Sequence, residues 1–388
     1  MELVRRYFEA PKGSFFLFGP RGTGKSTWLR QNYPDALYVD LLDPEVFRSY
    51  LARPERLREV IEANRLKSRI IIDEIQKAPT LLDVVHQILE DTRRRPPQFI
   101  LTCSSSRKLR RSGIDLLAGR ALLKTLHPFM ACELGAHFDL TQAMQLGMLP
   151  LVLASPEPHE TLKAYIALYM REEVQSEGIV RNVGNFSRFL EAISLSHGSL
   201  LNISEVAREC QVGRKTAEGF VQILEDLLLG FLVPVFTRRA RRQLVQHPKF
   251  YYMDAGVFRS IRPRGPLDSP YETGGLSLEG LVAQHLRAWI AYSKEVLQLS
   301  YWRTRAGSEV DFVVYGGETL AAIEVKSSKS VFSQDLRPLC AFLEDYPQAQ
   351  AYLLYRGRER LKMGSVLCLP CDEFLRQLVP NQPLHPRV

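Results

Sequence analysis

Hydrophobic and polar positions along the first part of the chain predict strands separated by helices. Stretches of strand length that are dominated by apolar residues occur at Phe15–Phe18, Arg69–Ile72 and Gln98–Thr102. Over Leu81–Thr92, apolar residues recur every three or four positions, which is the spacing of an amphipathic helix. The pattern therefore predicts an α/β protein whose first domain is built on a parallel sheet.

The middle of the chain has the pattern of a helical segment that leads into a helix-turn-helix. Residues 141–200 are predicted to be mainly helical and to form a lid or connector. A short helix, which Ser204 or Asn202 can cap, then precedes a tight turn at Gly213. A longer helix over residues 214–229 completes the motif.

Two strands predicted at 230–236 and 250–254 enclose a basic tip, which has the layout of a wing beside the helix-turn-helix. We expect this surface to contact DNA phosphates and to recognise shape or backbone rather than base sequence. The cations expected to contact DNA are Arg214, Lys215, Arg238, Arg239, Arg241 and Arg242. Because winged helices also dock proteins, a protein partner remains the alternative.

The C-terminal part is predicted to contain further strands at 301–304, 309–314 and 321–326. Side chains alternate between the two faces of a strand, so Glu324 and Lys326 share one face. An acid and a lysine on a buried strand are costly unless they have a role. The pair is therefore a candidate for chemistry.

Composition indicates the class of protein and its expected location but does not decide its function. The chain has 388 residues, 45% of them hydrophobic and 24% charged, which is ordinary for a soluble globular protein of two or three domains. Its formal net charge of +8 permits nucleic-acid binding. No apolar run is long enough to span a membrane and no secretory signal is found, so we expect a cytoplasmic protein without a membrane partner. Cys368 and Cys371 form a lone C-x-x-C, which we expect to pack rather than to bind zinc.

The run Gly-Pro-Arg-Gly-Thr-Gly-Lys-Ser at residues 19–26 indicates a phosphate-binding loop. It fits the pattern G-x-x-x-x-G-K-[ST] and stands between a predicted strand and a predicted helix, which argues against a chance glycine-rich turn. Backbone N–H groups and the helix N-terminus would bind the phosphates of ATP. Lys25 would reach the β- and γ-phosphates, and Ser26 would ligate Mg²⁺. The predicted nucleotide-binding residues of this loop are Gly19, Pro20, Arg21, Gly22, Thr23, Gly24, Lys25, Ser26 and Thr27.

Two acids, Asp73 and Glu74, follow the apolar run at residues 69–72. In this context Asp73 is predicted to orient Mg²⁺ and Glu74 to polarise the attacking water, which points to ATP hydrolysis. A polar residue at the end of the neighbouring strand would sense the γ-phosphate. Ser104 or Ser105 is the candidate, and a plain serine-rich turn is the alternative.

Arg120 is a candidate for a role between subunits. It would either reach the nucleotide of a neighbouring subunit and stabilise transition-state charge, or make only a surface salt bridge. Action on a neighbour would make the active form a homo-oligomer, for which a hexamer is one candidate.

These segments resemble a known family. Residues 19–26, Ile70–Lys77, Leu101–Ser106 and Leu117–Arg120 are similar to those of a prokaryotic family of AAA+ ATPases. The run Asp-Glu-Ile-Gln-Lys and the serine triplet are its more specific marks, whereas Cys103 replaces a glycine found in many members. The resemblance implies a C-terminal restriction-endonuclease-like domain of unknown function.

The acids near the C-terminus match the PD-(D/E)XK pattern of such domains. Asp311 and Glu324 would hold Mg²⁺, and Lys326 would orient or activate the attacking water. Glu279, on a helix predicted over Leu278–Tyr292, matches an accessory metal-binding acid. A remnant that binds DNA without cleaving it is the alternative.

The chain is thus predicted to comprise a P-loop AAA+ ATPase core (1–140), a helical lid or connector (141–200), a winged helix-turn-helix (201–260) and a restriction-endonuclease-like α/β domain (261–388). The predicted function is ATP hydrolysis coupled to binding and remodelling of DNA, or translocation on it, with a Mg²⁺-dependent nuclease-like domain. One alternative is a nucleotide-gated signalling or scaffold ATPase that docks proteins and has an inactive nuclease-like domain. Another alternative is a nuclease in which ATP only controls assembly.

Overall fold

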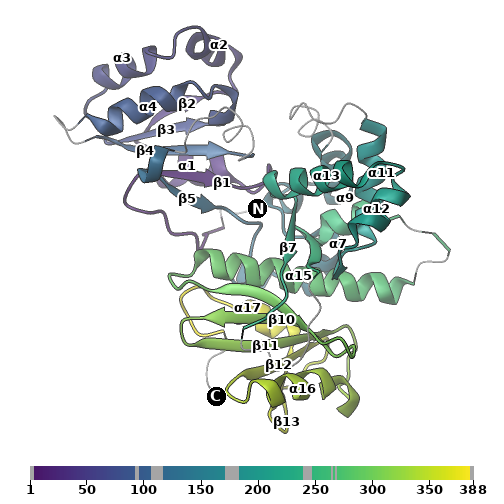
Figure 1. Ribbon diagram of the computed structural model, residues 1–388. Helices are drawn as coiled ribbons and strands as arrows, with labels where there is room; N and C mark the ends of the chain where they lie inside the picture. The colour runs from purple at the N-terminus through teal and green to yellow at the C-terminus, as the bar shows by residue number, and fades with distance from the viewer. Residues whose placement is uncertain are drawn as a thin grey trace. The chain divides into compact units, whose positions relative to one another are not determined.

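The computed structural model describes residues 4–91, 96–105, 117–170, 183–238, 247–263, 265–266 and 269–384. The chain divides into two compact units, which are described separately (Figure 1). The smaller unit comprises Phe8–His127 and Asp226–Leu228. The larger unit comprises Met1–Tyr7, Pro128–Glu225 and Leu229–Val388.

The smaller unit is built on a five-stranded parallel sheet with the strand order β2-β3-β4-β1-β5. Its strands are β1 (Phe15–Phe18), β2 (Leu37–Asp40), β3 (Arg69–Asp73), β4 (Gln98–Cys103) and β5 (Leu122–Thr125). Its described helices are α1 (Lys25–Asn32), α2 (Pro44–Ala52), α3 (Arg56–Ala63) and α4 (Leu81–Glu90), with the short turns η1 (Ile75–Lys77) and η2 (Leu117–Gly119). The predicted parallel sheet is confirmed, and β4 lies between β1 and β3.

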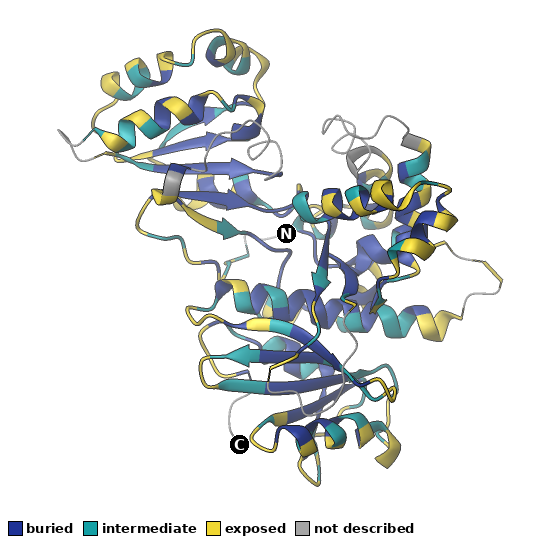
Figure 2. Ribbon diagram, viewed as in Figure 1, coloured by how far each residue is buried: buried dark blue, intermediate teal, exposed yellow. Residues whose placement is uncertain are grey.

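Helices pack against both faces of this sheet, and β1 is buried along its whole length (Figure 2). On one face, Phe16 and Leu101 belong to a core cluster with residues of α2, α3 and α4. On the other face, Phe15 packs near Phe8, whose ring meets Trp28 of α1 edge-on. Because both faces are covered, the edges where the strands begin and end are the places open to a ligand.

The first part of the larger unit is helical. Its described helices are α6 (Ala131–Leu134), η3 (Gly135–His137), α7 (Leu140–Leu146), α8 (Pro150–Leu153), α9 (Pro158–Ala164), η4 (Tyr165–Met170), α11 (Val183–Ser194), α12 (Ile203–Glu209), α13 (Arg214–Asp226) and α14 (Ala255–Ile261). Asn202, rather than Ser204, caps α12, because its side chain accepts the backbone N–H of Glu205. The predicted end of α13 at residue 229 is wrong: the helix ends at Asp226, and Leu228 adopts a positive φ of 58° that no α-helix allows.

A small antiparallel sheet follows α11 and has the order β6-β8-β7. Its strands are β6 (Ser199–Leu200), β7 (Gly230–Val233) and β8 (Lys249–Tyr252). β7 is shorter than predicted because Pro234, which lacks an N–H, follows it. All four residues of β8 are buried.

The C-terminal part of the larger unit is a mixed six-stranded sheet with the order β13-β14-β12-β11-β10-β9. Its strands are β9 (Gln298–Arg303), β10 (Glu309–Gly316), β11 (Thr319–Lys326), β12 (Gln350–Tyr355), β13 (Leu361–Met363) and β14 (Val366–Pro370), and its helices are α15 (Pro270–Tyr292), η5 (Ser333–Leu336), α16 (Arg337–Asp345) and α17 (Cys371–Gln377). β10 runs antiparallel to both of its neighbours, β9 and β11, whereas β12 runs parallel to β11 and β14. Within the described part of the chain, no helix combines the length and apolarity that crossing a membrane requires.

Candidate functional site

The loop between β1 and α1 is shaped by glycines at which a side chain would be strained or would clash. Gly24 has φ 85°, in the left-handed region that favours glycine, directly before α1 begins. A Cβ atom at Gly19 would lie 2.5 Å from the backbone oxygen of Leu126. The chain can therefore turn tightly from the end of β1 into the helix and leave the helix N-terminus pointing at the loop.

Lys25 extends along the inside of this loop. Its side chain is buried, and Nζ donates to the carbonyl of Gly19 at 2.6 Å and to that of Pro20 at 3.3 Å. Thr23 ties the same loop together, because its hydroxyl donates to Pro20 O at 2.8 Å. The loop thus folds around a cation, which is the arrangement that suits an anionic phosphate chain. Arg21 and Thr27 are exposed at the outside of the loop.

Asp73 ends β3 at the same edge of the sheet as the loop. It is fully buried, and its two carboxylate oxygens accept hydrogen bonds from the hydroxyls of Thr102 and Tyr38. Burial, with the carboxylate of Asp73 beside it, raises the pKa of Tyr38, so this hydroxyl stays protonated and donates. The side chain of Ser26 also lies close to Tyr38. Tyr38 thus stands beside both Ser26 and Asp73.

Glu74 points along the ends of the strands toward β4. It has φ 61°, which is uncommon for a side-chain-bearing residue, and its backbone N–H donates to Thr102 Oγ1 at 2.8 Å. Its carboxylate accepts from the amide of Gln76 and from the hydroxyl of Ser104 at 3.3 Å. Gln76 also donates to Ser104 at 2.8 Å. Of the two predicted serines, Ser104 is therefore the one that contacts Glu74.

The oxygen atoms at this edge fit a magnesium ion. Mg²⁺ prefers carboxylate and hydroxyl oxygens together with phosphate oxygens. Ser26 follows Lys25 at the start of α1, and Asp73 ends β3 at the same edge of the sheet; Tyr38 lies beside both. Both stand beside the loop that Lys25 occupies. These two residues would hold the ion.

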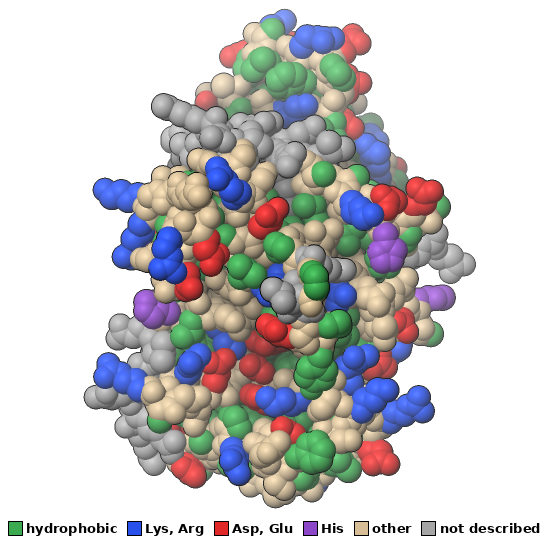
Figure 3. Space-filling view, turned by 90° about the vertical axis from the view of Figure 1, so that its right-hand side faces the viewer, with side chains coloured by type: hydrophobic (Ala, Val, Ile, Leu, Met, Phe, Trp, Pro, Cys, Tyr) green, Lys and Arg blue, Asp and Glu red, His purple; other side chains and the backbone are tan. Residues whose placement is uncertain are grey.

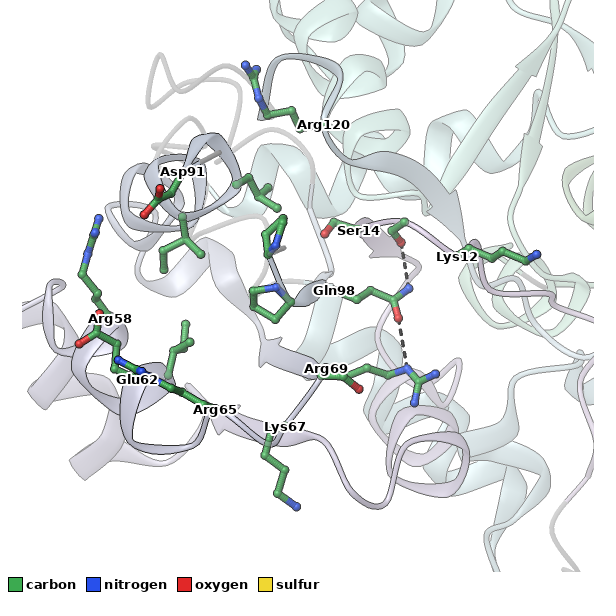
Figure 4. A pocket seen from close by; sticks show the side chains of 17 residues that line it. Lys12, Ser14, Arg58, Glu62, Arg65, Lys67, Arg69, Asp91, Gln98 and Arg120 are labelled. Atoms are coloured by element: carbon green, nitrogen blue, oxygen red, sulfur yellow. Dashed lines mark hydrogen bonds between the residues drawn. The ribbon is translucent and has the colours of Figure 1, made fainter. Parts of the chain in front are cut away.

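Arg120 lies at the opposite edge of the sheet. It precedes β5, which pairs in parallel with β1, whereas the phosphate-binding loop follows β1. Its guanidinium is ion-paired with Glu90 at 2.7 Å, and both side chains are about half exposed. The arginine lines a depression of about 970 Å³ at the amino ends of the strands (Figure 4). The cations of this depression are Lys12, Arg58, Arg65, Lys67, Arg69 and Arg120, and its acids are Glu62 and Asp91.

A second cluster of charges lies in the larger unit, around Lys249 of β8. The ammonium group of Lys249 is 2.5 Å from Glu309 Oε1, 3.2 Å from Glu279 Oε1 and 3.4 Å from Asp311 Oδ1. Only 1% of the lysine side chain is exposed. Tyr251, two residues along the same strand, donates its hydroxyl to Glu279 Oε1 at 2.6 Å. The predicted acids Glu279 and Asp311 are thus brought together, with a lysine between them.

Glu324 and Lys326 form the other part of this charge cluster. Their predicted position on one face of β11 agrees with the structure, since Lys326 Nζ lies 2.6 Å from Glu324 Oε1. Asp311 faces them, because its second oxygen accepts the backbone N–H of Val325 at 2.9 Å. Glu324 is 4% exposed, and among the described residues its other oxygen has no hydrogen-bond partner. Burial, with Asp311 close by, raises the pKa of Glu324 well above its usual value.

The cations predicted to contact DNA are exposed where the structure describes them. Arg214 is ion-paired with Glu218 at 2.9 Å, and Lys215 lies beside it at the start of α13. Arg238 is exposed with its guanidinium over the ring of Tyr315. The other predicted contacts, Arg239, Arg241 and Arg242, lie outside the described residues.

Comparisons with known families match three successive parts of the sequence. The AAA domain matches residues 12–135. A domain of unknown function, DUF8612, matches residues 137–268, and a second one, DUF4143, matches residues 274–374. No curated protein matches the chain.

The chain carries an AAA domain. An AAA domain implies nucleotide binding, usually with Mg²⁺, and it suggests an ATPase. The loop at residues 19–26 and the acids Asp73 and Glu74 all lie within the matched part. The charge cluster lies mostly in the DUF4143 domain, which supplies Glu279, Glu309, Asp311 and Glu324, whereas Lys249 comes from the part that matches DUF8612.

Several residues of both sites escaped sequence reasoning. In the AAA domain these are Tyr38, Gln76 and Thr102, which hold Asp73, Glu74 and Ser104 in place. Gln76 could have been recognised from the sequence, because it belongs to the run Asp-Glu-Ile-Gln-Lys that marks the family. In the larger unit, Lys249 stands at the head of the apolar strand Lys-Phe-Tyr-Tyr, and a lysine in such a strand marks a buried charge in need of partners.

Proposed function

We propose that the protein hydrolyses ATP to ADP and phosphate at the edge of the AAA domain where β1, β3 and β4 end. One observation carries this proposal: the phosphate-binding loop, the pair Asp73 and Glu74, and Ser104 meet at this edge although they are far apart in sequence. A site that only bound nucleotide would have no use for a carboxylate held beside the γ-phosphate position. Hydrolysis therefore accounts for the arrangement better than binding alone.

Each residue at this edge has a definite task in the proposed reaction. Lys25 and the N-terminus of α1 bind the phosphates and offset the charge that develops on them. Ser26 and Asp73 would hold Mg²⁺, which would supply electrostatic stabilisation of the transferring phosphoryl group. Glu74 accepts a hydrogen bond from the attacking water and aligns it in line with the γ-phosphate. Ser104, linked to Glu74 through Gln76, fixes the direction of that carboxylate.

Arg120 supports a homo-oligomer as the active form. β5 runs parallel to β1, so the phosphate-binding loop after β1 lies level with the end of β5. Arg120 lies six residues before that point, which is roughly 20 Å along the strand. A side chain cannot cross this distance within one subunit. Arg120 would instead approach the nucleotide of a neighbouring subunit and stabilise transition-state charge there, and a ring such as a hexamer would provide this geometry.

The DUF8612 part of the chain supports DNA as the partner. The order α11, β6, α12, α13, β7, β8, with the sheet order β6-β8-β7, supports our interpretation of this part as a winged helix, in which α13 would be the recognition helix. Arg214 and Lys215 at the start of α13 and Arg238 after β7 are exposed and would contact phosphates. ATP hydrolysis would then drive remodelling of DNA or movement along it.

A nucleotide-gated scaffold that docks proteins is the second candidate, and one observation favours it. Over the described part of the face shown in Figure 3, Lys and Arg side chains are interspersed with Asp and Glu and form no continuous basic stripe. In addition, Arg214 is already paired with Glu218. A mixed surface of this kind suits a protein partner as well as DNA.

We interpret the C-terminal DUF4143 domain as restriction-endonuclease-like. A helix, α15, precedes three antiparallel strands, and a helix, α16, then leads to the parallel strand β12. In this interpretation Asp311, Glu324 and Lys326 would be the PD-(D/E)XK residues, with Glu279 on α15 as the accessory acid. The residues do not fit Mg²⁺ as they stand, because Lys249 is in contact with Glu279 and Asp311. Among the described residues, moreover, no group of three or more His, Cys, Asp and Glu is arranged to hold a metal ion.

The experiment that tests the proposed function is the rate of phosphate release from ATP, with Mg²⁺, for the wild type and for Lys25→Ala. The rate is measured without DNA and with duplex, single-stranded and branched DNA. We expect hydrolysis by the wild type, loss of hydrolysis in Lys25→Ala, and stimulation by one form of DNA. Absence of Mg²⁺-dependent hydrolysis under all of these conditions would overturn the ATPase proposal. Hydrolysis without any DNA effect would favour the scaffold.

A further inference from the structure

The charge cluster of the larger unit is centred on an ammonium group. Lys249 lies within 2.5–3.4 Å of carboxylate oxygens from β10 and α15. Glu309, the closest of these acids, is also ion-paired with Arg303 at 2.8 Å. In the restriction-endonuclease-like interpretation above, on which this inference rests for the location of the metal, Glu279 and Asp311 would be metal ligands. The lysine therefore stands where the metal would be.

Electrostatics account for the position of the lysine. An isolated ammonium group or carboxylate in a protein interior is costly, but opposite charges in direct contact offset each other. Burial by itself would lower the pKa of Lys249, but the neighbouring carboxylates, Glu279 first among them, raise it well above its usual value. The side chain therefore remains a cation. Burial, and secondarily the nearby charge of Asp311, raise the pKa of Glu279 to about 7.

The backbone holds this lysine firmly. Lys249 begins β8, the central strand of the small sheet, and pairs with Leu200 on one side and Val233 on the other. Lys249 and Tyr251 are two positions apart and share a face of the strand, so the strand delivers both an ammonium group and a hydroxyl to Glu279. Moving the backbone of Lys249 away from the acids would require β8 to leave its place between β6 and β7.

We propose that Lys249 is an internal counter-ion that takes the place of a divalent metal in the DUF4143 domain. While it is present, Glu279, Asp311 and Glu324 bind neither Mg²⁺ nor Mn²⁺, because the ammonium group occupies the space between the acids and repels a second cation. Removing the ammonium group leaves buried acids without their cation, and this turns the cluster into a site for a divalent ion. Glu324, whose second oxygen has no hydrogen-bond partner among the described residues, is a ready ligand.

Mn²⁺ binding to the full-length chain tests this proposal, with electron paramagnetic resonance as the readout and with no nucleotide present. We compare wild type, Asp311→Asn, Lys249→Ala and the double variant Lys249→Ala/Asp311→Asn. Lys163, an exposed lysine of α9, provides the matched control Lys163→Ala. We expect Lys249→Ala to bind one Mn²⁺ per chain that the wild type does not bind, and the double variant to lose it. Lys163→Ala should behave as the wild type.

Two results would overturn the proposal: Mn²⁺ binding by the wild type that Asp311→Asn abolishes, or no additional binding by folded Lys249→Ala. Thermal unfolding gives a second readout, because Mn²⁺ should raise the melting temperature of Lys249→Ala and leave that of the wild type unchanged. If Lys249→Ala does not fold, the comparison of wild type with Asp311→Asn decides: equal Mn²⁺ binding supports the proposal. The Asp311→Asn variants separate Mn²⁺ binding at the cluster from binding elsewhere, and no ATP is hydrolysed in the assay, so a failure here is distinct from a failure of ATP hydrolysis.

Discussion

The hydroxyl of Thr102, at the end of β4, donates a hydrogen bond to the buried carboxylate of Asp73, at the end of β3. The same oxygen accepts the backbone N–H of Glu74 at 2.8 Å. One side chain thus fixes the position of both acids in the AAA domain. Because the two acids have different tasks in the proposed hydrolysis, a change at Thr102 should disturb both together.

Replacing Thr102 with valine should lower ATP turnover about tenfold, as losses of supporting hydrogen bonds around a metal site do. Valine has the same shape but leaves Asp73 and the N–H of Glu74 without this partner. Thr102→Ser keeps the hydroxyl and is the matched control. Phosphate release at saturating ATP is the measurement, and equal rates for Thr102→Val and wild type would show that this hydrogen bond has no role in turnover.

Glu74→Gln should lower turnover by about 100-fold or more and leave ATP affinity nearly unchanged, because an amide keeps the size of the side chain but is a far weaker base. Single-turnover hydrolysis and nucleotide binding are measured on the same preparation. Glu62→Gln, an exposed acid on α3, is the control for loss of a charge. Unchanged hydrolysis in Glu74→Gln would remove this residue from its role.

Arg120→Ala should lower turnover at least about 100-fold if the arginine stabilises charge on a neighbouring subunit's nucleotide. Glu90→Gln breaks the same ion pair without removing the cation, so it should leave turnover unchanged. Mixing Arg120→Ala with Glu74→Gln should restore part of the activity, because some interfaces then combine an intact arginine with an intact glutamate. Equal rates for wild type and Arg120→Ala would mean that Arg120 has no role in hydrolysis and makes only a surface salt bridge.

The double change Arg214→Ala/Lys215→Ala should weaken DNA binding and flatten its salt dependence. Each phosphate contact that is lost lowers the slope of log affinity against log salt by about 0.9 for duplex DNA. Lys163→Ala, an exposed lysine on α9, is the control. Affinity is measured by fluorescence anisotropy over a range of salt concentrations. Binding by the wild type that does not respond to salt would speak for the protein-docking alternative.

Ionisation of the buried carboxyl group of Asp254 should lower the free energy of unfolding of the larger unit as the pH rises. Asp254 is fully buried as the cap of α14 and accepts backbone N–H groups of Met148, Gly256 and Val257. Burial raises the pKa of Asp254 from 3.8 to about 6, although these N–H donors act in the opposite direction. Because the folded-state pKa lies above that of the unfolded chain, its stabilisation is complete below about pH 3.8 and is lost as the pH rises to about 6.

Denaturant unfolding of wild type and Asp254→Asn between pH 4 and 8 measures this effect. The wild type should lose up to about 1.4 kcal/mol of unfolding free energy per pH unit more than the variant between pH 4 and 6, and nothing more above that range. Asp139→Asn, which changes an exposed capping carboxylate on α7, is the matched control. Parallel curves for wild type and Asp254→Asn would contradict the expectation.

Features that depend on contiguous residues were accessible from the sequence. The loop at residues 19–26, the strand that ends at Asp73 and the shared face of Glu324 and Lys326 all follow from local pattern and strand geometry. The end of α13 was placed too late because apolar spacing continues past Asp226, whereas the backbone at Leu228 has already left the helical region. Periodicity describes which face is buried and does not record where a helix stops.

Local pattern in the sequence was enough to predict a phosphate-binding loop, and it places a pair of acids after a buried strand and an acid and a lysine on one strand face near the C-terminus. Only the tertiary structure decided which distant side chains complete these groups. Strand order brings Thr102 to Asp73, and the packing of β8 brings Lys249 to Glu279 and Asp311. The physical reason is that a buried charge takes its partner from whichever element lies closest in space, and spacing along the chain carries no record of that choice.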